Sequence, residues 1–338
     1  MQFNKIGMNL QGRIDLMSRL GSYLLEDDAE WLQAKQQAYQ KNGWFTPDFI
    51  DLACRNIANN FLDKSKLTAW ARHYQPDDNI ASKNVGIVMA GNIPLVGFHD
   101  FLAVFISGHH QTIKLSSKDD VLLRHFVKKL REWEPAFESR LTISELLKGC
   151  DAYIATGSNN SSRYFEQYFS KVPHIIRRNR TSAAVLSGNE TADDLDKLSD
   201  DIHQYFGLGC RNVSKLFVPR EYDFIPLIRS FDKYAFFADH HKYKNNYDYQ
   251  FSLILLNNIY YMTNGATLLT ENEALFSPIS QLYFEYYDNK AELLSKMESN
   301  NDLQCVVADE KTTFGSAQTP GLFSYADGVD TMQFLLSI

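Results

Sequence analysis

The sequence lacks the features that mark zinc proteins, disulfide-rich secreted proteins and nucleic-acid-binding proteins. Its 338 residues include only four cysteines, which are widely spaced and form no CxxC pair: Cys54, Cys150, Cys210 and Cys305. Neither a zinc site nor a redox pair is therefore indicated, and reduced thiols in a cytoplasm are the simplest expectation. Lysine and arginine number 34 against 41 aspartates and glutamates, so the net charge of −7 gives no global basic surface for nucleic acid.

The sequence also lacks an uninterrupted apolar run of membrane-spanning length. The start, MQFNKIGMNLQGRIDL, contains no continuous apolar segment of the signal-peptide kind, so a cytoplasmic location is expected. Residues 85–108 are the longest apolar stretch, but four polar or helix-breaking residues interrupt it: Asn92, Pro94, His99 and Asp100. A buried strand, a turn and a buried helix explain this stretch better than a membrane span.

What is present indicates an α/β protein with two intimately packed domains, since one small core cannot organise a chain of this length. Residues 11–75 show helical apolar spacing, with Thr46 placed as an N-cap before Pro47. From residue 84 short apolar runs alternate with helical patterns, which predicts a mainly parallel sheet with crossover helices. The expected strands lie in NVGIVMA, QTIKLS, CDAYIATGS, HIIRR and SAAVLSG, and the expected helices in LVGFHDFLAVFISG, DVLLRHFVKKLREW and SSRYFEQYFSK.

Three polar segments follow strands of this predicted sheet: GNIP (91–94), KLSSKD (114–119) and TGSN (156–159). Ligands of parallel sheets gather at the carboxyl ends of the strands. We therefore expect the three segments to share one crevice.

The second half of the chain begins with a helix that has a capping box from Thr191 to Asp194 and leads to Cys210. Further strands are expected in VSKLFVP, FSLILLN and QLYFEYYD, with an irregular tyrosine-rich segment at 234–250. The C-terminal portion has loop character and then a short strand or helix. Cys54, Cys150 and Cys305 fit buried positions, whereas Cys210 follows a glycine-bracketed break and is either a buried filler or an exposed nucleophile.

Taken together, the motifs resemble the aldehyde dehydrogenase superfamily and, within it, the long-chain acyl-CoA reductases of the bacterial bioluminescence type. AGNIPL (90–95) resembles a Trp-Asn-Phe-Pro turn, which implies that Asn92 donates to the substrate oxyanion. GLGCRN (207–212) resembles Gly-Gln-X-Cys, which implies that Cys210 is the nucleophile. The resemblance runs through residues 84–219, 271–280 and 314–335.

The same resemblance implies the cofactor-binding residues. IKLSSKD resembles the Lys-Pro-Ser-Glu segment that binds the adenosine ribose, so Lys114 matches the lysine while Ser117 replaces the glutamate. ATGSNN resembles the Thr-Gly-Ser turn at the cofactor pyrophosphate, with Gly157 and Ser158 matching. ENEALFSPIS resembles the Glu-Glu-Ile-Phe-Gly-Pro segment near the nicotinamide; its matches are Phe276 and Pro278, while Glu273 is one place away from the ribose glutamate.

One departure from the superfamily bears on the reaction. The Glu-Leu-Gly-Gly run of the superfamily carries the general base that activates water, and its counterpart here, RRNRTSAAVL (177–186), contains no carboxylate. An acyl group on Cys210 would lack the usual base for hydrolysis. This favours reduction of an acyl-CoA, with a fatty acyl-CoA as the expected substrate, to the aldehyde through a cysteine thioester.

The resemblance implies an aldehyde-dehydrogenase-like α/β fold: a Rossmann-type parallel-sheet cofactor domain, a smaller α/β catalytic domain and an N-terminal helical region. The expected domains are 1–182 with the N-terminal helices and nucleotide site, 183–315 with the nucleophile, and 316–338 returning to the body. The glutamate of the resembled segment would repel the 2′-phosphate of NADPH, and Ser117 removes that repulsion. Lys118 adds positive charge, so NADPH is expected, with NADH as the alternative. Expected partners are an acyl-CoA, whose CoA is part of the substrate, and a second copy or an acyl-supplying enzyme.

Each of these residues also has an ordinary structural explanation. Asn92 would cap the following helix, Lys114 would be a solvated lysine, Phe276 would be core and RRNR would be a solvated charge run rather than a contact for CoA phosphates. The histidines fit surface or core positions better than a metal site, since no carboxylate or cysteine lies at ligand spacing. Two other functions stay open: a non-reducing acyl-transfer enzyme that uses Cys210, and a catalytically silent dehydrogenase-like scaffold.

Overall fold

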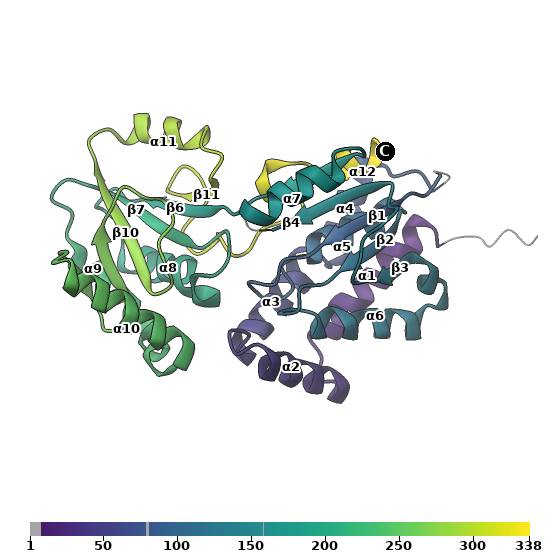
Figure 1. The fold of residues 1–338 in the computed structure, drawn as a ribbon, viewed down its shortest axis with the longest axis horizontal. Coiled ribbons are helices and arrows are strands. Elements are labelled where there is room, and N and C mark those ends of the chain that lie inside the picture. The colour runs from purple at the N-terminus through teal and green to yellow at the C-terminus, as the bar shows by residue number, and fades with distance from the viewer. Residues whose placement is uncertain (1–7, 79–80, 158) are drawn as a thin grey trace, which may run out of the picture. The chain divides into compact units, whose positions relative to one another are not determined.

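Two sheets organise the chain, one in each of two compact units (Figure 1). The computed structural model describes residues 8–78, 81–157 and 159–338. Unit 1 comprises Met1–Asn179 and Pro320–Ile338, and unit 2 comprises Arg180–Thr319. The predicted domain limits at 182/183 and 315/316 lie close to these divisions. Among the residues described, no helix has both the length and the apolar character that a membrane crossing needs.

Four helices open unit 1, as the apolar spacing of residues 11–75 predicts. Each helix is preceded by a residue suited to an N-cap. The side-chain oxygen of such a residue accepts from backbone N–H groups in the first turn that have no partner within the helix. Asn9, Asp28 and Asp63 accept from backbone N–H groups three residues on, and Thr46 precedes Pro47 at the first turn. The helices are α1 (Leu10–Leu24), α2 (Ala29–Lys41), α3 (Pro47–Asn60) and α4 (Lys64–Tyr74).

The sheet of unit 1 is entirely parallel, with the strand order β3-β2-β1-β4-β5. This order is that of a Rossmann-type doubly wound sheet, as expected. Its strands are β1 (Asn84–Val88), β2 (His110–Lys114), β3 (Leu141–Ile143), β4 (Ala152–Thr156) and β5 (His174–Arg177). The connections contain α5 (Phe98–Ser107), α6 (Val121–Trp133), η1 (Pro135–Arg140) and α7 (Asn159–Phe169). The short β3 was not predicted, because three residues carry too little periodicity.

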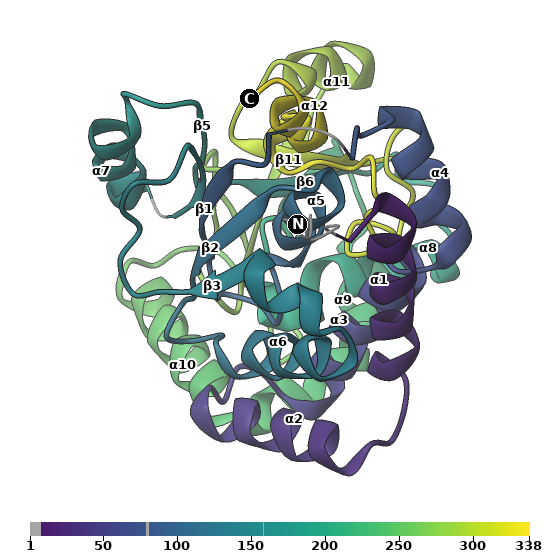
Figure 2. The same ribbon diagram turned by 90° about the vertical axis from the view of Figure 1, so that its right-hand side faces the viewer.

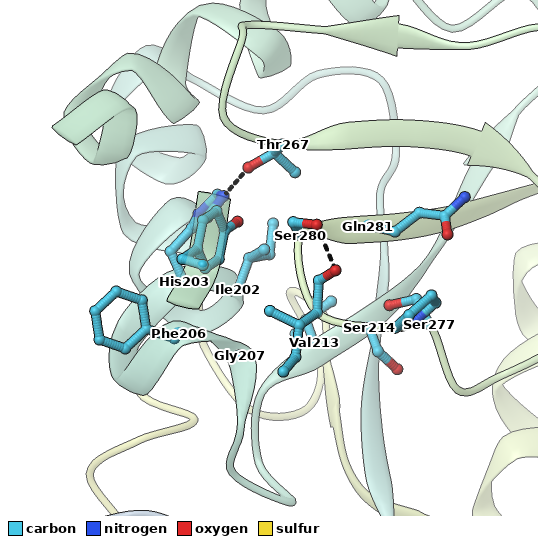
Figure 3. A pocket seen from close by; sticks show the side chains of 13 residues that line it. Ile202, His203, Phe206, Gly207, Val213, Ser214, Thr267, Ser277, Ser280 and Gln281 are labelled. Carbon is cyan, nitrogen blue, oxygen red and sulfur yellow. Dashed lines mark hydrogen bonds between the residues drawn. The ribbon is translucent and has the colours of Figure 1, made fainter. Parts of the chain in front are cut away.

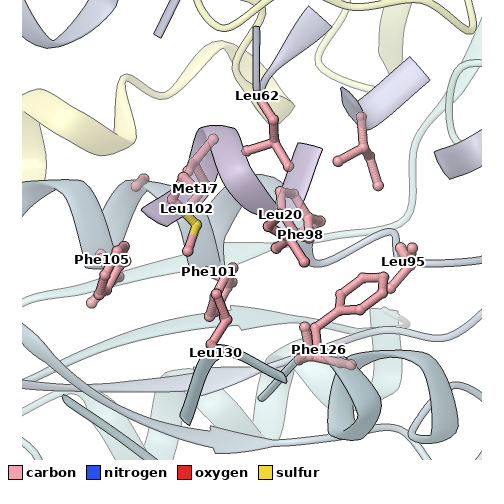
Figure 4. Close-up of a cluster of buried hydrophobic side chains, with 14 of the residues drawn as sticks. Met17, Leu20, Leu62, Leu95, Phe98, Phe101, Leu102, Phe105, Phe126 and Leu130 are labelled. Carbon is pink, nitrogen blue, oxygen red and sulfur yellow. The ribbon is translucent and has the colours of Figure 1, made fainter. Parts of the chain in front are cut away.

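The two faces of this sheet are covered by different helices. In β1 the alternate residues Val85 and Ile87 join a large core with the N-terminal helices, α5 and α6. Figure 4 shows part of this core, with Met17 of α1, Phe101 of α5 and Phe126 of α6. Val88 instead joins a smaller cluster with Tyr153 and Phe169, under α7. Figure 2 shows α7 on one side of the sheet and α1, α4 and α5 on the other. Each phenylalanine fully buried in the large core contributes about 1.5–3 kcal/mol.

The sheet of unit 2 has six strands in the order β11-β6-β7-β10-β9-β8, all parallel except for the pair β8 and β9. Thr191 and Asp194 form the predicted capping box at the start of α8. The strands are β6 (Thr181–Val185), β7 (Val213–Pro219), β8 (Met262–Thr263), β9 (Leu268–Glu271), β10 (Gln281–Tyr287) and β11 (Leu303–Val307). The helices are α8 (Ala192–His203), η2 (Gln204–Gly207), α9 (Phe224–Ser230), η3 (Phe231–Asp239), α10 (His241–Leu256) and α11 (Lys290–Glu298).

Two predictions for unit 2 are wrong. Residues 251–257 were expected as a strand and 234–250 as irregular, but η3 and α10 cover almost all of both segments. A short apolar run has no periodicity that separates a strand from a helix. In α10 only Tyr243 and Ile254 are buried, so the apolar side chains at its end do not form a sheet face.

The C-terminal segment belongs to unit 1 and ends in the helix α12 (Thr331–Leu336), after the short η4 (Ala326–Gly328). The buried Arg177 at the end of β5 forms an ion pair with Asp100 of α5, and its Nη2 donates to Thr331 Oγ1 at 2.8 Å. Trp70 Nε1 donates to the Tyr325 hydroxyl at 3.0 Å. The segment is therefore part of the core of unit 1.

Candidate active site

Three loops meet at one edge of the sheet of unit 1. Val88, the last residue of β1, pairs with Lys114 at the end of β2 and with Ala155 near the end of β4. The segments GNIP, KLSSKD and TGSN follow these three neighbouring strands, as the sequence predicts. The chain crosses from β1 to β2 on one side and to β4 on the other, and parallel sheets bind ligands at such a switch point.

Asn92 lies exposed in the loop after β1. The helix that follows, α5, begins at Phe98 with Gly97 as its N-cap, so Asn92 is not the N-cap and that structural explanation is wrong. The loop is fixed further on, where Leu95 adopts a left-handed φ of 57° and its N–H donates to Asp119 Oδ2 at 2.7 Å. Asn92 therefore lies in a loop at the carboxyl edge of the sheet.

Lys114 and Ser117 are both exposed at the end of β2. The Lys114 carbonyl accepts from the Met89 N–H at 3.0 Å, so the loop after β1 begins directly beside this strand. A Cβ at Gly91 would lie 2.5 Å from Ser116 Oγ, which means that only glycine allows the two loops to approach so closely. An ammonium group and a hydroxyl therefore lie on the loop beside that of Asn92.

Gly157 follows β4, and its N–H donates to the Arg177 carbonyl at 3.3 Å. A Cβ at this position would lie 2.9 Å from both Phe165 and Ser161 of α7. The glycine is therefore required for the helix to start close against the strand. Ser158, the other predicted residue of this turn, lies outside the described residues.

Asp119 is a residue of this edge that was expected only to open a helix. Its side chain is buried, and this burial raises its pKa from 3.8 to about 7 despite the hydrogen bond from the Leu95 N–H. Oδ1 has no hydrogen-bond partner among the described residues. Two consecutive aspartates before a helix were the only signal in the sequence, and they indicate a helix start rather than a buried carboxyl.

Cys210 lies in a turn between α8 and β7. The chain leaves α8 through Tyr205, Phe206 and Gly207, all left-handed with φ values of 56°, 58° and 72°. Such a conformation is unfavourable for side chains larger than glycine by roughly 1–2 kcal/mol per residue. Cys210 is half-buried, and its carbonyl accepts from Ser182 Oγ at 3.0 Å.

Asn212 closes this turn and was not predicted as a site residue. Its Oδ1 accepts from the Gly209 N–H at 2.7 Å, and its backbone N–H donates to the Gly209 carbonyl at 3.1 Å. Its Nδ2 donates to carbonyls at the end of α8 and in η2. No pattern in the sequence could show these contacts, because they depend on the path of the chain between α8 and β7.

The other cysteines differ in their surroundings. Cys54 and Cys150 are buried, as expected, and burial raises the pKa of each thiol. Cys305 lies on β11, as expected, but is only half-buried, with its Sγ 3.0 Å from Ser182 Oγ. Burial raises the pKa of Cys305, while its contacts with Ser182 and Arg211 oppose the rise.

Glu273 and Phe276 lie in the exposed segment between β9 and β10. Phe276 is 39% exposed, so it is not a core residue. The Leu275 carbonyl accepts from Ser214 Oγ at 2.6 Å, which fixes the segment beside the start of β7. The segment therefore lies near the Cys210 turn, within unit 2.

A cavity of about 40 Å³ is lined by residues on both sides of Cys210, including Phe206 and Val213 (Figure 3). His203 forms part of its wall. His203 Nδ1 donates to the Ser199 carbonyl at 2.8 Å, so Nε2 accepts from the Thr267 hydroxyl at 2.9 Å. Burial lowers the His203 pKa to about 4, so this ring is neutral and structural at pH 7.

The basic run at 177–180 has structural partners. Arg177 is buried against Asp100, Arg178 forms an exposed pair with Glu166 at 2.6 Å, and Arg180 donates to the Leu303 carbonyl at 3.1 Å. Among the residues described, no group of three histidine, cysteine, aspartate or glutamate side chains is placed to hold a metal ion.

No family model matches the chain, and no curated protein matches it. Solved structures, in contrast, match the chain. Aldehyde dehydrogenase 21 from Physcomitrella patens, in complex with the product succinate, matches with a TM-score of 0.65 and 11% identity over 88% of this chain and 72% of that one. An aldehyde dehydrogenase from Bacillus cereus in complex with NAD+ matches with a TM-score of 0.62 and 13% identity over 87% and 70%.

An indole-3-acetaldehyde dehydrogenase from P. syringae, in complex with NAD+ and IAA, matches with a TM-score of 0.61 and 13% identity over 87% of this chain and 70% of that one. At such low identity these likenesses show the fold alone. The fold is that of the aldehyde dehydrogenases, as the sequence motifs predicted.

Proposed function

We propose that this protein reduces an acyl-CoA thioester, with a fatty acyl-CoA as the expected substrate, to the aldehyde by using a nicotinamide cofactor and a thioester on Cys210. One observation carries the proposal. The half-buried Cys210 lies on a turn beside β6, and residues 177–186, which contain β6, hold no carboxylate to activate water. A nucleophile beside a segment without that carboxylate suits acyl transfer from one thiol to another followed by reduction.

The donors at the edge of unit 1 fit a nicotinamide dinucleotide. Lys114 and Ser117 offer an ammonium and a hydroxyl to a ribose or a phosphate, and the turn at Gly157 leads into the start of α7, which favours negative charge. Glu273 and Phe276 are further candidates from unit 2. When bound, the reduced cofactor supplies the hydride. The fold neighbours solved with NAD+ support the same class of cofactor for this chain.

The residues of the chain account for the acyl-transfer step. The Cys210 thiolate attacks the thioester carbonyl and forms a carbon–sulfur bond, and the Asn92 amide donates to the developing oxyanion. Collapse breaks the bond to the CoA sulfur, which leaves as a thiolate and takes a proton, while the acyl group stays on Cys210. Residues 177–186 provide no carboxylate that would activate water to hydrolyse this thioester. The acyl group therefore stays on Cys210 until it is reduced.

The loop after β2 favours NADPH over NADH. A glutamate at position 117 would accept from the ribose 2′-hydroxyl and repel a 2′-phosphate, whereas the uncharged Ser117 does not repel the phosphate. Lys118, exposed on the same turn, adds positive charge.

A homo-oligomer or a complex with an acyl-supplying enzyme also stays a prediction, as does the cytoplasmic location.

The test is to incubate the full chain with a panel of acyl-CoAs and NADPH and to follow the nicotinamide absorbance. Loss of absorbance with aldehyde formation is expected, and Cys210→Ala should reduce the rate at least ~1,000-fold because no acyl group can be held. Cys305→Ala is the matched control, since Cys305 is equally half-buried and lies beside the same serine.

Intact mass then separates the alternatives. An acyl adduct that is absent in Cys210→Ala, without NADPH oxidation, would replace reduction with non-reducing acyl transfer. Neither an adduct nor oxidation with any acyl-CoA would leave only a dehydrogenase-like scaffold.

A further inference from the structure

Cys210 follows the carboxyl end of a helix, which is an unfavourable place for a thiolate. α8 ends at His203, and the carboxyl end of a helix has a partial negative charge; the η2 turn that follows contains the left-handed Tyr205 and Phe206. Cysteine pKa values fall at helix N-termini and beside cations. The helix that delivers Cys210 therefore opposes its ionisation unless the last carbonyls of the helix are neutralised.

Asn212 covers these carbonyls. Its Nδ2 donates to the carbonyls of Asp201 and Ile202, both at 3.2 Å, and of Gln204 at 2.8 Å. The side chain is 2% exposed, so the three contacts are shielded from water. A single amide thus provides the positive end of its dipole to three carbonyls at the end of the helix.

The same side chain fixes the turn on its other side. Oδ1 accepts from the Gly209 N–H at 2.7 Å, directly before Cys210. The Asn212 carbonyl accepts from the Ser182 N–H at 3.1 Å, which ties the turn to β6. Asn212 therefore connects the end of α8, the start of the turn and the neighbouring strand.

We propose that Asn212 is a positioning residue for the Cys210 nucleophile: it covers the negative end of α8 and so lets the thiolate form on the turn that it holds. The inference rests on the proposed function, in which Cys210 is the nucleophile. Asparagine suits this role because its side chain donates and accepts at once without carrying a charge.

Other titratable groups face the turn or its supports, among them Asp201, whose pKa burial raises to about 7 and whose backbone carbonyl accepts from Asn212 Nδ2. Asp201 accepts from the Gly315 and Ala317 N–H groups, and burial keeps His203 neutral. The remaining groups on the elements packed here are Arg211 of the turn, Lys215 of β7 paired with Glu285, Tyr243 of α10 and Cys305 of β11.

The experiment measures alkylation of Cys210 by iodoacetamide as a function of pH in the full chain, with peptide mapping to separate Cys210 from Cys305. Asn212→Ala uncovers the three carbonyls, and Asn212→Asp keeps the acceptor for Gly209 but loses the amide donor. In both variants we expect the apparent pKa of Cys210 to rise by about one, with alkylation about 10-fold slower at pH 7 and equal to wild type at high pH.

Asn257→Ala is the matched control, because Asn257 Nδ2 donates to the Leu253 carbonyl at the end of α10 in an exposed position. The Asn257→Ala variant should show the same dependence of Cys210 alkylation on pH as the wild type. The proposal is overturned if the apparent pKa of Cys210 stays constant in both Asn212 variants, including the case in which the rate drops equally at every pH. Circular dichroism identifies a variant that fails to fold, and the other variant then decides.

The alkylation needs neither acyl-CoA nor NADPH. A wild type that oxidises no NADPH with any acyl-CoA would therefore refute the proposed function without bearing on the pKa effect, and an unchanged pKa profile in an active reductase would refute only the role of Asn212.

Discussion

The two sheets present their candidate site residues at opposite ends of their strands. In unit 1 the loops with Asn92, Lys114 and Gly157 follow the carboxyl ends of β1, β2 and β4. In unit 2 the Cys210 turn precedes β7, at the amino end of its strand, and follows the carboxyl end of α8. The first arrangement is the one in which parallel sheets ordinarily bind ligands.

This difference separates what topology provides from what individual side chains must provide. The edge of unit 1 follows from strand order, with Gly91 allowing the loops after β1 and β2 to approach and Gly157 allowing α7 to start close to β4. The turn of unit 2 depends on left-handed residues at 205–207 and on the contacts of Asn212, which hold the chain around Cys210. We therefore expect substitutions in the loops after β2 and β4 to act on cofactor binding and substitutions at the turn to act on the sulfur.

The largest effect outside Cys210 itself is expected for Asn92→Ala. Removing one oxyanion donor lowers the rate on the order of 100–1,000-fold, with a small change in KM for NADPH. Asn189→Ala, an exposed asparagine of unit 2, is the control. Steady-state kinetics with acyl-CoA measure the rate and the KM of both variants. A change confined to KM would assign Asn92 to substrate binding and reject its role as an oxyanion donor.

Gly157→Ala tests the close approach of α7 to β4. The added methyl meets Phe165 and Ser161 at 2.9 Å, so α7 must shift. We expect the free energy of unfolding to fall by about 1–3 kcal/mol and the KM for NADPH to rise about 10-fold. Gly321→Ala is the control, because its Cβ meets nothing within 4 Å. Urea titration and kinetics measure both quantities, and unchanged cofactor binding would separate this turn from the cofactor.

Ser117→Glu tests the loop after β2. A carboxylate there should repel a 2′-phosphate and accept from a 2′-hydroxyl, which shifts the ratio of kcat/KM for NADPH over NADH downward by about 10-fold. Ser116→Ala is unsuitable as a control, since Ser116 contacts Gly91. The control is Ser144→Ala, in the loop after β3. A ratio unaffected by Ser117→Glu would place the adenosine ribose elsewhere.

The smallest effect concerns Asp119 and stability. Burial raises its pKa from 3.8 to about 7, so the folded state binds a proton more tightly than the unfolded chain. Its contribution to stability is therefore full below about pH 4 and is lost as the pH rises to about 7. Asp119→Asn should remove this slope, flattening the pH dependence of the free energy of unfolding by about 1–3 kcal/mol. Urea titrations at several pH values measure the slope, with the exposed Asp27→Asn as the control.

The sequence predicts the sheet of unit 1 better than the surroundings of the sulfur. Alternation in NVGIVMA and the glycine turns identify the strands and the loops after them, because these depend on neighbouring residues. The run at 251–256 was misassigned because a short apolar segment suits a strand and a helix equally. Asp119 and Asn212 were missed because their roles depend on carbonyls and N–H groups that lie far apart in the chain or point inward only after folding.

The return of the chain to unit 1 sets the order in which the protein can fold during synthesis. His109 Nε2 bonds the Leu335 carbonyl at 2.9 Å, and Arg177 requires Thr331, so the first unit translated waits for the last residues of the chain. The whole of unit 2 leaves the ribosome before that core is closed. The core of unit 1 therefore stays open until unit 2 has been made, and a chain stopped before residue 320 would expose the face of α5 that α12 covers.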